Sequence, residues 1–296
     1  MSIRSSKEIT MSVSLSRIAC VGALATALVL SGCSGSSGSG AKVASDCKPA
    51  HTFNTVSSKK LTISAPDFAP FVSKKDNTQS GIDVDVINQI AAMECLSTNF
   101  LQVDYSGAIP AVQSKRADVA IGDYYRTTSR AEVVGLSKAM YVDGMGLVSK
   151  DGVKDIPTVI THNVGTVDGY LWVNDMKKLM GDKLKIYKSN VEMFADLKAG
   201  RIDVGIDSVP AAQFQADQNK DAGLQVATAN PDDQVGASVK PAQVGIPYTK
   251  DNADLGKALD DDIATLRGNG KLDQIFTDHN VDTSLTKLDG DYLVQS

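Results

Sequence analysis

The sequence has few of the residues from which metal centres and nucleophilic active sites are usually built. It contains four cysteines, three histidines and one tryptophan among 296 residues, and no two cysteines have the Cys-x-x-Cys spacing of a zinc site. The histidines at 51, 162 and 279 are scattered singly, so we expect no metal site and no cofactor. A Gly-x-Ser-x-Gly motif is absent, and the Gly-Asn-Gly-Lys run at 268–271 lacks the spacing of a phosphate-binding loop. These absences argue against an enzyme.

Long apolar runs are also missing after residue 30. The one such run, Ile18–Leu30, has 13 residues and follows Arg17, which suits a signal segment but is too short to span a bilayer. It leads into Leu-Ser-Gly-Cys, the pattern that lipoprotein processing recognises. We therefore expect residues 1–32 to be removed and Cys33 to carry the lipid, which anchors the protein on the outer face of the cytoplasmic membrane. Two alternatives stay open, a start at Met11 and an uncleaved core helix.

Basic residues do not outnumber acidic residues in this chain. The chain has 30 Lys and Arg against 35 Asp and Glu, and removal of residues 1–32, which carry a charge of +2, leaves −7 on the remaining 264 residues. This sign argues against nucleic acid or anionic lipid as a partner. The content of 42% hydrophobic and 22% charged residues is that of a globular protein, long enough for one large or two ordinary domains.

Only two cysteines remain once Cys20 leaves with the signal segment and Cys33 takes lipid. Cys47 and Cys95 lie in an exported chain, where one disulfide between them is expected, and two free thiols are the alternative. Residues 33–59 are rich in Ser, Gly, Ala and Lys and have few large apolar residues, so we predict a flexible tether there.

From residue 60 the sequence alternates short β-rich runs with helical periodicity. The first cycle predicts strands at 61–64, 100–105 and 118–122, a helix that Asp83 or Asp85 caps and a helix at 108–115. After a strand at 144–149, the second cycle predicts strands at 159–164, 184–187 and 202–207 and helices at 169–180, 191–199 and 211–218. A strand at 243–248 and two helices follow, and the acidic run 260–262 is interpreted as a solvated helix face. We predict an α/β fold with two Rossmann-like lobes, the first from residues 60–149 and 245–287 and the second from 150–244.

Five segments, in order, match motifs of one known family: Phe-Ala-Pro-Phe at 68–71, Gly-Ile-Asp-Val-Asp at 81–85, Ile-Pro-Ala-Val-Gln-Ser-Lys-Arg-Ala-Asp at 109–118, Gly-Thr at 165–166 and Leu-Lys-Ala-Gly-Arg-Ile-Asp at 197–203. Through them, residues 61–281 resemble the solute-binding proteins of bacterial amino-acid ABC importers. The resemblance implies the type II periplasmic-binding-protein fold, with two crossing strands near 149–152 and 242–245. It also implies a monomer without catalytic activity that passes a small ligand to a membrane permease. A ligand-sensing receptor and a dehydratase-like enzyme on the same fold remain alternatives.

The resemblance also implies where the ligand binds. Arg130, seven residues before Ser137, falls on the family arginine that grips the ligand's α-carboxylate, and a guanidinium fork suits a carboxylate. Asp207 falls on the aspartate that takes the α-ammonium group, with Ser208 as the competing position. The alternative for Arg130 is a surface side chain paired with Glu132 or with an aspartate upstream.

The chain departs from the family pattern just before Arg130. Asp123 and Tyr125 stand where the family commonly has Gly and Thr. The extra carboxylate could hold an ammonium group, while Phe68, Tyr124 and Tyr125 could supply aromatic faces for a cation. Alternatively, Asp123 only offsets Arg130 or the arginine at 126.

In the second lobe, Gly165 and Thr166 precede the predicted helix that contains Trp172. Backbone N–H groups at such a helix start could receive an anion. Trp172 either caps the pocket or packs inside the lobe. The expected ligand is a small zwitterion or a cation-bearing acid, such as a polar or basic amino acid, an opine or a betaine.

Overall fold

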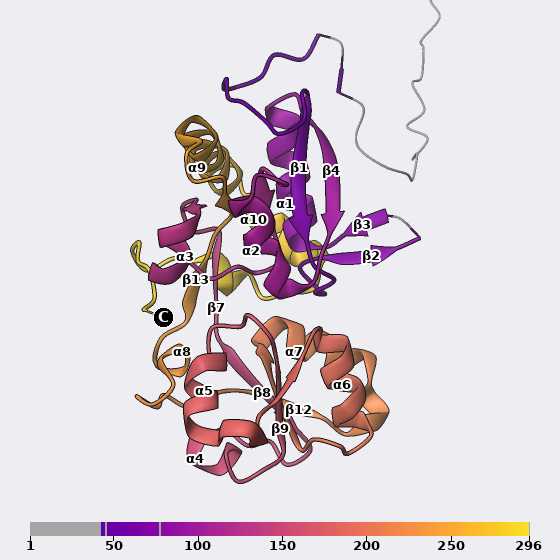
Figure 1. The fold of residues 1–296 in the computed structure, drawn as a ribbon. Helices are drawn as coiled ribbons and strands as arrows, with labels where there is room; N and C mark the ends of the chain where they lie inside the picture. The colour runs from indigo at the N-terminus through magenta and orange to yellow at the C-terminus, as the bar shows by residue number, and fades with distance from the viewer. Residues whose placement is uncertain (1–42, 45, 77, 296) are drawn as a thin grey trace, which may run out of the picture. The chain divides into compact units, whose positions relative to one another are not determined.

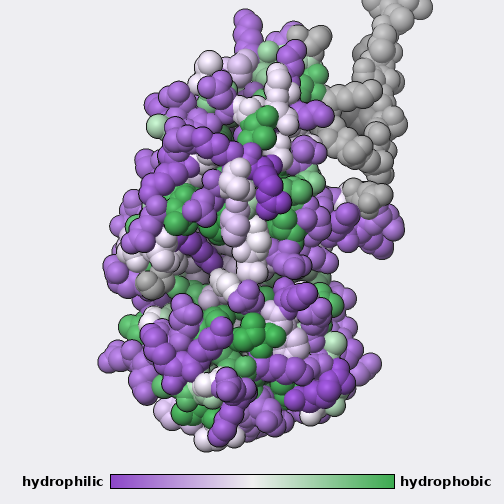
Figure 2. All heavy atoms as spheres, viewed as in Figure 1, coloured by the Kyte–Doolittle hydropathy of each residue, from purple (hydrophilic) through white to green (hydrophobic). Residues whose placement is uncertain are grey.

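The computed structural model of the protein describes residues 43–44, 46–76 and 78–295. The predicted signal segment and the predicted lipidation site Cys33 lie outside these residues. The described chain forms two α/β lobes, each built on a five-stranded sheet, so the predicted fold class is confirmed (Figure 1). No helix among the residues described is long and apolar enough to cross a membrane. Hydrophilic residues cover most of the surface seen in Figure 2.

The first lobe has its sheet strands in the order β4, β1, β5, β14, β6. β1 is parallel to β4 and β5, and β14 is antiparallel to β5 and β6. The strands are β1 (Lys60–Ala65), β4 (Ser97–Gln102), β5 (Val119–Ala120), β6 (Gly135–Leu136) and β14 (Pro247–Tyr248). Residues 61–65 are all buried, as in a strand covered on both faces of its sheet.

Five helices and one hairpin complete this lobe. The helices are α1 (Ile82–Met93), α2 (Tyr105–Gln113), α3 (Thr128–Val133), α9 (Ala253–Gly268) and α10 (Lys271–Asp278); β2 (Ser73–Lys75) and β3 (Thr78–Ser80) form the hairpin. α1 begins after Gly81, which has φ +130° and where a Cβ would lie 2.3 Å from the carbonyl oxygen of Phe71. Glycine is therefore required there. The predicted cap was wrong, because Asp83 lies inside the first turn and is buried.

The second lobe has its sheet in the order β10, β9, β11, β8, β12. The strands are β8 (Met145–Ser149), β9 (Val164–Val167), β10 (Lys185–Tyr187), β11 (Val204–Ser208) and β12 (Gln225–Thr228). The helices are α4 (Ile156–Val159), α5 (Val173–Met180), α6 (Asn190–Lys198), α7 (Val209–Gln218) and α8 (Gly236–Val239). Short 3-10 turns lie at Gly181–Lys183, Lys220–Ala222 and, in the first lobe, Thr283–Thr286.

Two antiparallel strands, β7 (Tyr141–Asp143) and β13 (Ala242–Val244), join the lobes as a hinge (Figure 1). The predicted first crossing at 149–152 was placed too late. β8 already pairs with β11 and β12 in the second sheet, so residues 145–149 belong to the second lobe and the crossing lies at β7.

Three further expectations need correction. Residues 156–159 form helix α4 and the next strand begins at Val164, whereas the sequence predicted a strand at 159–164. Helix α5 begins at Val173, because Gly169, with φ +85°, places a turn where helix was expected. The C-terminal part of the predicted tether is packed on the first lobe: Val56 N–H donates to Asp118 Oδ1 at 2.7 Å.

The disulfide between Cys47 and Cys95 is present, which confirms the expected pairing and fixes this segment beside the end of α1. At the other end of the chain, residues beyond 287 also pack on the first lobe. Val294 N–H donates to the carbonyl oxygen of Arg126 at 3.0 Å.

Candidate functional site

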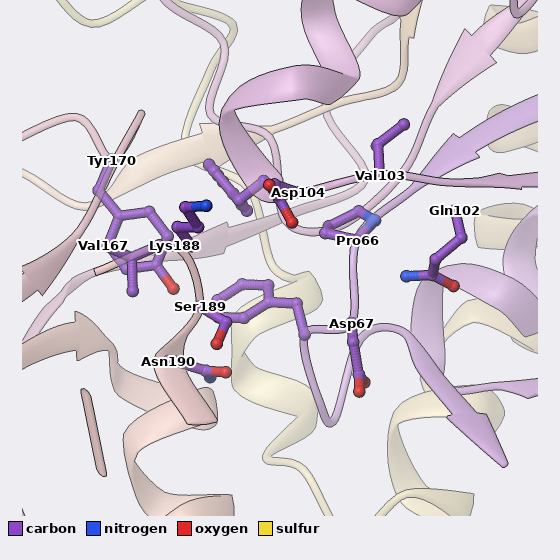
Figure 3. A pocket seen from close by; sticks show the side chains of 12 residues that line it. Pro66, Asp67, Gln102, Val103, Asp104, Val167, Tyr170, Lys188, Ser189 and Asn190 are labelled. Carbon is purple, nitrogen blue, oxygen red and sulfur yellow. The ribbon is translucent and has the colours of Figure 1, made fainter. Parts of the chain in front are cut away.

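A small cavity lies where the two lobes meet. Its walls are Phe68, Tyr105, Asp123 and Tyr125 from the first lobe and Tyr170, Trp172 and Ser208 from the second. Its volume of about 10 Å³ is close to the space that one water molecule needs. A groove of about 400 Å³ shares three of these aromatic residues and extends between Asp67 and Asp104 on one side and Lys188–Asn190 on the other (Figure 3).

Aromatic rings from both lobes form most of the cavity wall. Tyr105 meets Tyr170 edge to face with ring centroids 4.8 Å apart, and Tyr170 meets Trp172 in the same way at 5.2 Å. The ring centroid of Phe68 lies 5.6 Å from that of Tyr105 and 5.8 Å from that of Tyr170. Such ring faces carry a negative potential, so the cavity can hold a cationic group.

Three buried carboxyl groups surround this aromatic cluster, namely Asp123, Asp143 and Asp207. Burial, with the neighbouring charge of Asp143, raises the pKa of Asp123 well above its usual range. Burial likewise raises the pKa of Asp143, whose Oδ2 accepts a hydrogen bond from the Tyr125 hydroxyl at 3.1 Å. Asp123 Oδ1 is buried and has no hydrogen-bond partner among the described residues. An incoming cation would satisfy this oxygen.

Asp83 holds Asp123 in place. Its Oδ2 accepts hydrogen bonds from the N–H groups of Gly122 and Asp123, both at 2.9 Å, and its Oδ1 accepts one from the Tyr141 hydroxyl at 2.8 Å. Asp123 has φ +59°, in the left-handed region that few residues other than glycine adopt. The buried carboxylate of Asp83 therefore fixes a strained turn that points Asp123 into the site.

Asp207 lies in strand β11 of the second lobe, one residue before the strand ends. Its carboxylate accepts hydrogen bonds from the Tyr170 hydroxyl at 3.0 Å and from Asn190 Nδ2 at 3.2 Å. Burial raises the pKa of Asp207 to about 7. The competing position, Ser208, uses its Oγ to accept from Ala211 N–H at the start of α7, although Ser208 also lines the cavity.

Arg130 lies on α3, beside the aromatic cluster. Its Nη1 donates to the carbonyl oxygen of Tyr125 at 2.8 Å, and its Nη2 donates across the lobes to the carbonyl oxygen of Gly169 at 3.2 Å. The guanidinium carbon is 5.2 Å from the ring centroid of Tyr124. Both groups that Arg130 meets here are neutral acceptors, which a carboxylate could replace.

The alternative ion pairs expected for Arg130 and Asp123 do not form among the described residues. Within the described chain, no ion pair joins Arg130 to Glu132 or to Asp123. Arg126 pairs instead with Asp291 and donates to Gln243 Oε1 at 2.7 Å.

Two of the predicted site residues serve the interior of the second lobe. A Cβ at Gly165 would lie 2.6 Å from Ile202 Cδ1, so glycine is needed for packing. Thr166 Oγ1 donates to the carbonyl oxygen of Ile206 and accepts from Trp172 Nε1 at 2.7 Å. The expected anion site at a helix start is not formed here, because residues 164–167 are a strand paired on both sides and helix α5 begins only at Val173.

Trp172 was expected either to cap the pocket or to pack inside the lobe. It is buried in the second lobe and also lines the cavity. Tyr124 stacks on Tyr105 with centroids 4.7 Å apart and supports the wall from behind. Four residues of the site were missed from the sequence, namely Tyr105, Asp143, Tyr170 and Asn190. Tyr105 and Tyr170 could have been found, because they follow the carboxyl ends of parallel strands β4 and β9, where ligands bind in open α/β sheets.

Known proteins are similar to this chain in sequence and fold. The chain is 25% identical to the lysine/arginine/ornithine-binding periplasmic protein of Escherichia coli (strain K12) over 229 residues, which cover 72% of this chain and 85% of that protein. It is 26% identical to the probable amino-acid-binding protein YxeM of Bacillus subtilis (strain 168) over 218 residues, or 70% of this chain and 78% of that protein. A solved structure of an ancestral arginine-binding protein bound to glutamine matches with a TM-score of 0.68 and 26% identity, covering 76% of this chain and 99% of the other.

The sequence model for "Bacterial extracellular solute-binding proteins, family 3" matches residues 62–281. This range contains both hinge strands, the residues that line the cavity between the lobes, and both sheets except for the first two residues of β1. The protein therefore belongs to the bacterial extracellular solute-binding proteins, family 3.

Proposed function

We propose that this protein captures a small amino-acid-like ligand between its lobes and delivers it to an ABC importer. The ligand carries a carboxylate, which Arg130 grips, and an ammonium group, which Asp207 receives. The observation that carries the proposal is the placement of Arg130 and Asp207 on opposite lobes beside one aromatic cavity. Relatives named for binding lysine, arginine, ornithine or other amino acids support it.

The charges around the cavity favour a ligand with a positive group beyond its α-ammonium. Four buried carboxyl groups, on Asp123, Asp143, Asp207 and, behind Asp123, Asp83, stand against the guanidinium of Arg130. A cation among the aromatic rings would relieve the repulsion between the first two of these carboxyls. We therefore place basic amino acids and related cationic acids ahead of neutral ones.

Binding requires hinge motion. A cavity of about 10 Å³ cannot hold an amino acid, so the walls must separate at β7 and β13 before a ligand enters. A ligand that contacts both lobes then shifts the population toward the form in which they meet. No bond is made or broken in this cycle, and we infer that the protein is not an enzyme.

We also propose that lipidation of Cys33 anchors the protein to the outer face of the cytoplasmic membrane. The folded part begins near Cys47, which the disulfide holds on the first lobe. The intervening chain, rich in Ser and Gly, would serve as a short tether that keeps a monomeric domain near the permease.

Calorimetric titration of the purified protein with a panel of amino acids and amines tests the proposal. We expect one site per chain, tightest for a basic amino acid, with each titrant recovered unchanged. Arg130→Ala should abolish this binding, whereas Arg116→Ala, which removes an exposed arginine remote from the cavity, should leave it intact. Equal affinity in both variants would reject the assignment of Arg130, and turnover of a titrant would favour an enzyme.

A further inference from the structure

A second cluster of polar side chains lies away from the ligand cavity, where the N-terminal segment packs on the first lobe. It consists of His51 on that segment, Glu94 at the end of α1 and Asp262 on α9. One ring nitrogen of His51 and one carboxylate oxygen of each acid lie within 4.8 Å of one another. The Glu94 side chain is 1% exposed and Asp262 is 3% exposed, so the two acids are almost completely removed from water.

Both ring nitrogens of His51 face carboxylates. Nδ1 is 2.6 Å from Glu94 Oε1, and Nε2 is 3.1 Å from Asp261 Oδ2. A neutral imidazole has one N–H group, so it can donate to only one of these oxygens. The other nitrogen then presents a lone pair to a carboxylate, and a proton or a metal ion must supply positive charge between them.

A proton on His51 would supply that charge but would leave Asp262 without a partner. A doubly protonated ring donates one hydrogen bond to Glu94 and one to Asp261, and none remains. Asp262 Oδ2 is buried and has no hydrogen-bond partner among the described residues. The basic side chain of Lys257 pairs with the exposed Asp261 and not with Asp262. Two buried carboxylates thus exceed the single charge of a protonated imidazole.

We propose that His51, Glu94 and Asp262 form a binding site for a divalent transition-metal ion such as Zn²⁺. His51 Nδ1 and one oxygen from each acid are the ligands, and a solvent molecule completes the coordination. Because Nε2–H donates to Asp261, the carboxylate of Asp261 orients the ring, an arrangement common around metal-bound histidine. One nitrogen and two carboxylate oxygens suit Zn²⁺ better than Ca²⁺ or Mg²⁺, which prefer oxygen alone.

The site would fasten the N-terminal segment to two helices of the first lobe. Beside it lies a groove of about 410 Å³, lined in part by His51, Glu94 and Cys95, which gives an ion a path from solvent. The disulfide of Cys95 with Cys47 holds the same segment a few residues away. The sequence did not indicate a metal site, because His51 and Asp262 are far apart along the chain and the acidic run was interpreted as solvated.

Titration of Zn²⁺ into the metal-free protein tests the proposal. The protein should carry no histidine tag and an intact disulfide, so that neither a tag nor free thiols bind the ion. We expect saturable binding of one Zn²⁺ per chain and a rise in melting temperature that Ca²⁺ at the same concentration does not produce. His51→Ala and Asp262→Asn should each abolish this binding, and Asp261→Asn should weaken it by about 10- to 100-fold.

His279→Ala is the matched control. His279 is as exposed as His51, at 24% against 22%, but has one carboxylate partner, Asp85, at 2.7 Å. This variant should bind Zn²⁺ as the unaltered protein does. Circular dichroism of each variant checks folding. Absence of stoichiometric Zn²⁺ binding by the unaltered protein would overturn the proposal, as would unchanged binding by folded His51→Ala and Asp262→Asn.

Discussion

Arg130 Nη2 donates a hydrogen bond to the carbonyl oxygen of Gly169 at 3.2 Å, and this bond joins helix α3 of the first lobe to the turn after β9 of the second. The acceptor is neutral, so a ligand carboxylate would make a shorter and stronger bond with the same guanidinium. Arg130 can therefore hold the lobes together before binding and exchange that contact for the ligand.

Replacement of Arg130 by lysine tests whether ligand binding needs only a positive charge at this position or also the planar shape of the guanidinium. Lysine keeps the positive charge but cannot form two parallel hydrogen bonds with a carboxylate. We expect the affinity for the best amino-acid ligand to fall by about 10- to 100-fold, since a hydrogen bond to a charged group contributes about 1.5–3 kcal/mol. The melting temperature should change little, because Arg130 is only half-buried. An affinity equal to that of the unaltered protein, measured by calorimetry, would show that the Arg130 guanidinium does not form two parallel hydrogen bonds with the ligand carboxylate.

Ligand affinity should depend on pH through Asp207. Its pKa of about 7 means that the carboxyl is largely protonated at pH 5.5, whereas an ammonium group binds the ionised form. Binding then releases a proton, so affinity for an ammonium-bearing ligand rises with pH below 7, approaching tenfold per unit, and levels off above 8. Asp123 and Asp143, whose pKa values burial also raises, act in the same direction, and the Tyr170 hydroxyl that faces Asp207 stays protonated throughout.

Calorimetry in buffers of different ionisation enthalpy at pH 6 measures this proton release directly. Asp207→Asn should bind more weakly and release fewer protons. A flat pH profile between 5.5 and 8 in the unaltered protein would remove the ammonium role from Asp207.

The pair formed by Asp123 and Asp143 should destabilise the ligand-free protein at high pH. Their carboxyls lie close together in a buried site, and each unit by which a pKa is raised corresponds to about 1.4 kcal/mol lost when the group ionises. Asp143→Asn removes one charge, so we expect the free energy of unfolding to increase by about 1 kcal/mol or more at pH 8. The gain should shrink as the pH falls toward 5, because the raised pKa values favour protonation of the pair, which removes the repulsion.

Urea unfolding at the two pH values measures this difference, with Asp182→Asn on the exposed surface of the second lobe as the control. The same Asp143→Asn variant should bind cationic ligands less tightly than the unaltered protein and neutral ones nearly as well. A stability change that is equal at pH 5 and pH 8 would mean that charge repulsion is not its cause.

Much of the fold could be predicted from local patterns. Burial of every residue from 61 to 65 and the apolar face of α1 both follow the periodicity expected for a covered strand and an amphipathic helix. The strand expected at 159–164 failed because a short helical turn and a β-rich run look alike over four to six residues. Helix 169–180 started too early because Gly169 adopts a positive φ that periodicity does not indicate.

The site was harder to predict, since it depends on pairs that meet only in the fold. Asp143 was missed because it stands in a hinge strand, and its meeting with Asp123 requires the chain to turn back on itself. Gly165 and Thr166 were selected by motif, yet packing against Ile202 and a hydrogen bond from Trp172 explain them. Thus a sequence motif indicates that certain residue types are required at certain positions, but it does not indicate whether ligand binding or core packing requires them.

The C-terminal residues 288–295 should stabilise the hinge through Arg126. The Arg126 side chain is 8% exposed; it pairs with Asp291 and donates to the carbonyl oxygen of Tyr292 at 3.2 Å. Gln243, in hinge strand β13, donates through Nε2 to the carbonyl oxygen of Gly290 at 2.8 Å. Truncation after residue 287 would leave a buried guanidinium with one side-chain acceptor, at a cost of about 3–5 kcal/mol in the free energy of unfolding.

Asp291→Ala should have a smaller effect, about 1 kcal/mol, because the Asp291 side chain is 66% exposed and water can replace it. Asp289→Ala, at an exposed neighbouring position, is the control and should change nothing measurable. Urea unfolding with a constant denaturant slope measures all three variants. If truncation leaves the midpoint unchanged, then Gln243 alone satisfies Arg126, and the first lobe ends at residue 287 as the sequence predicted.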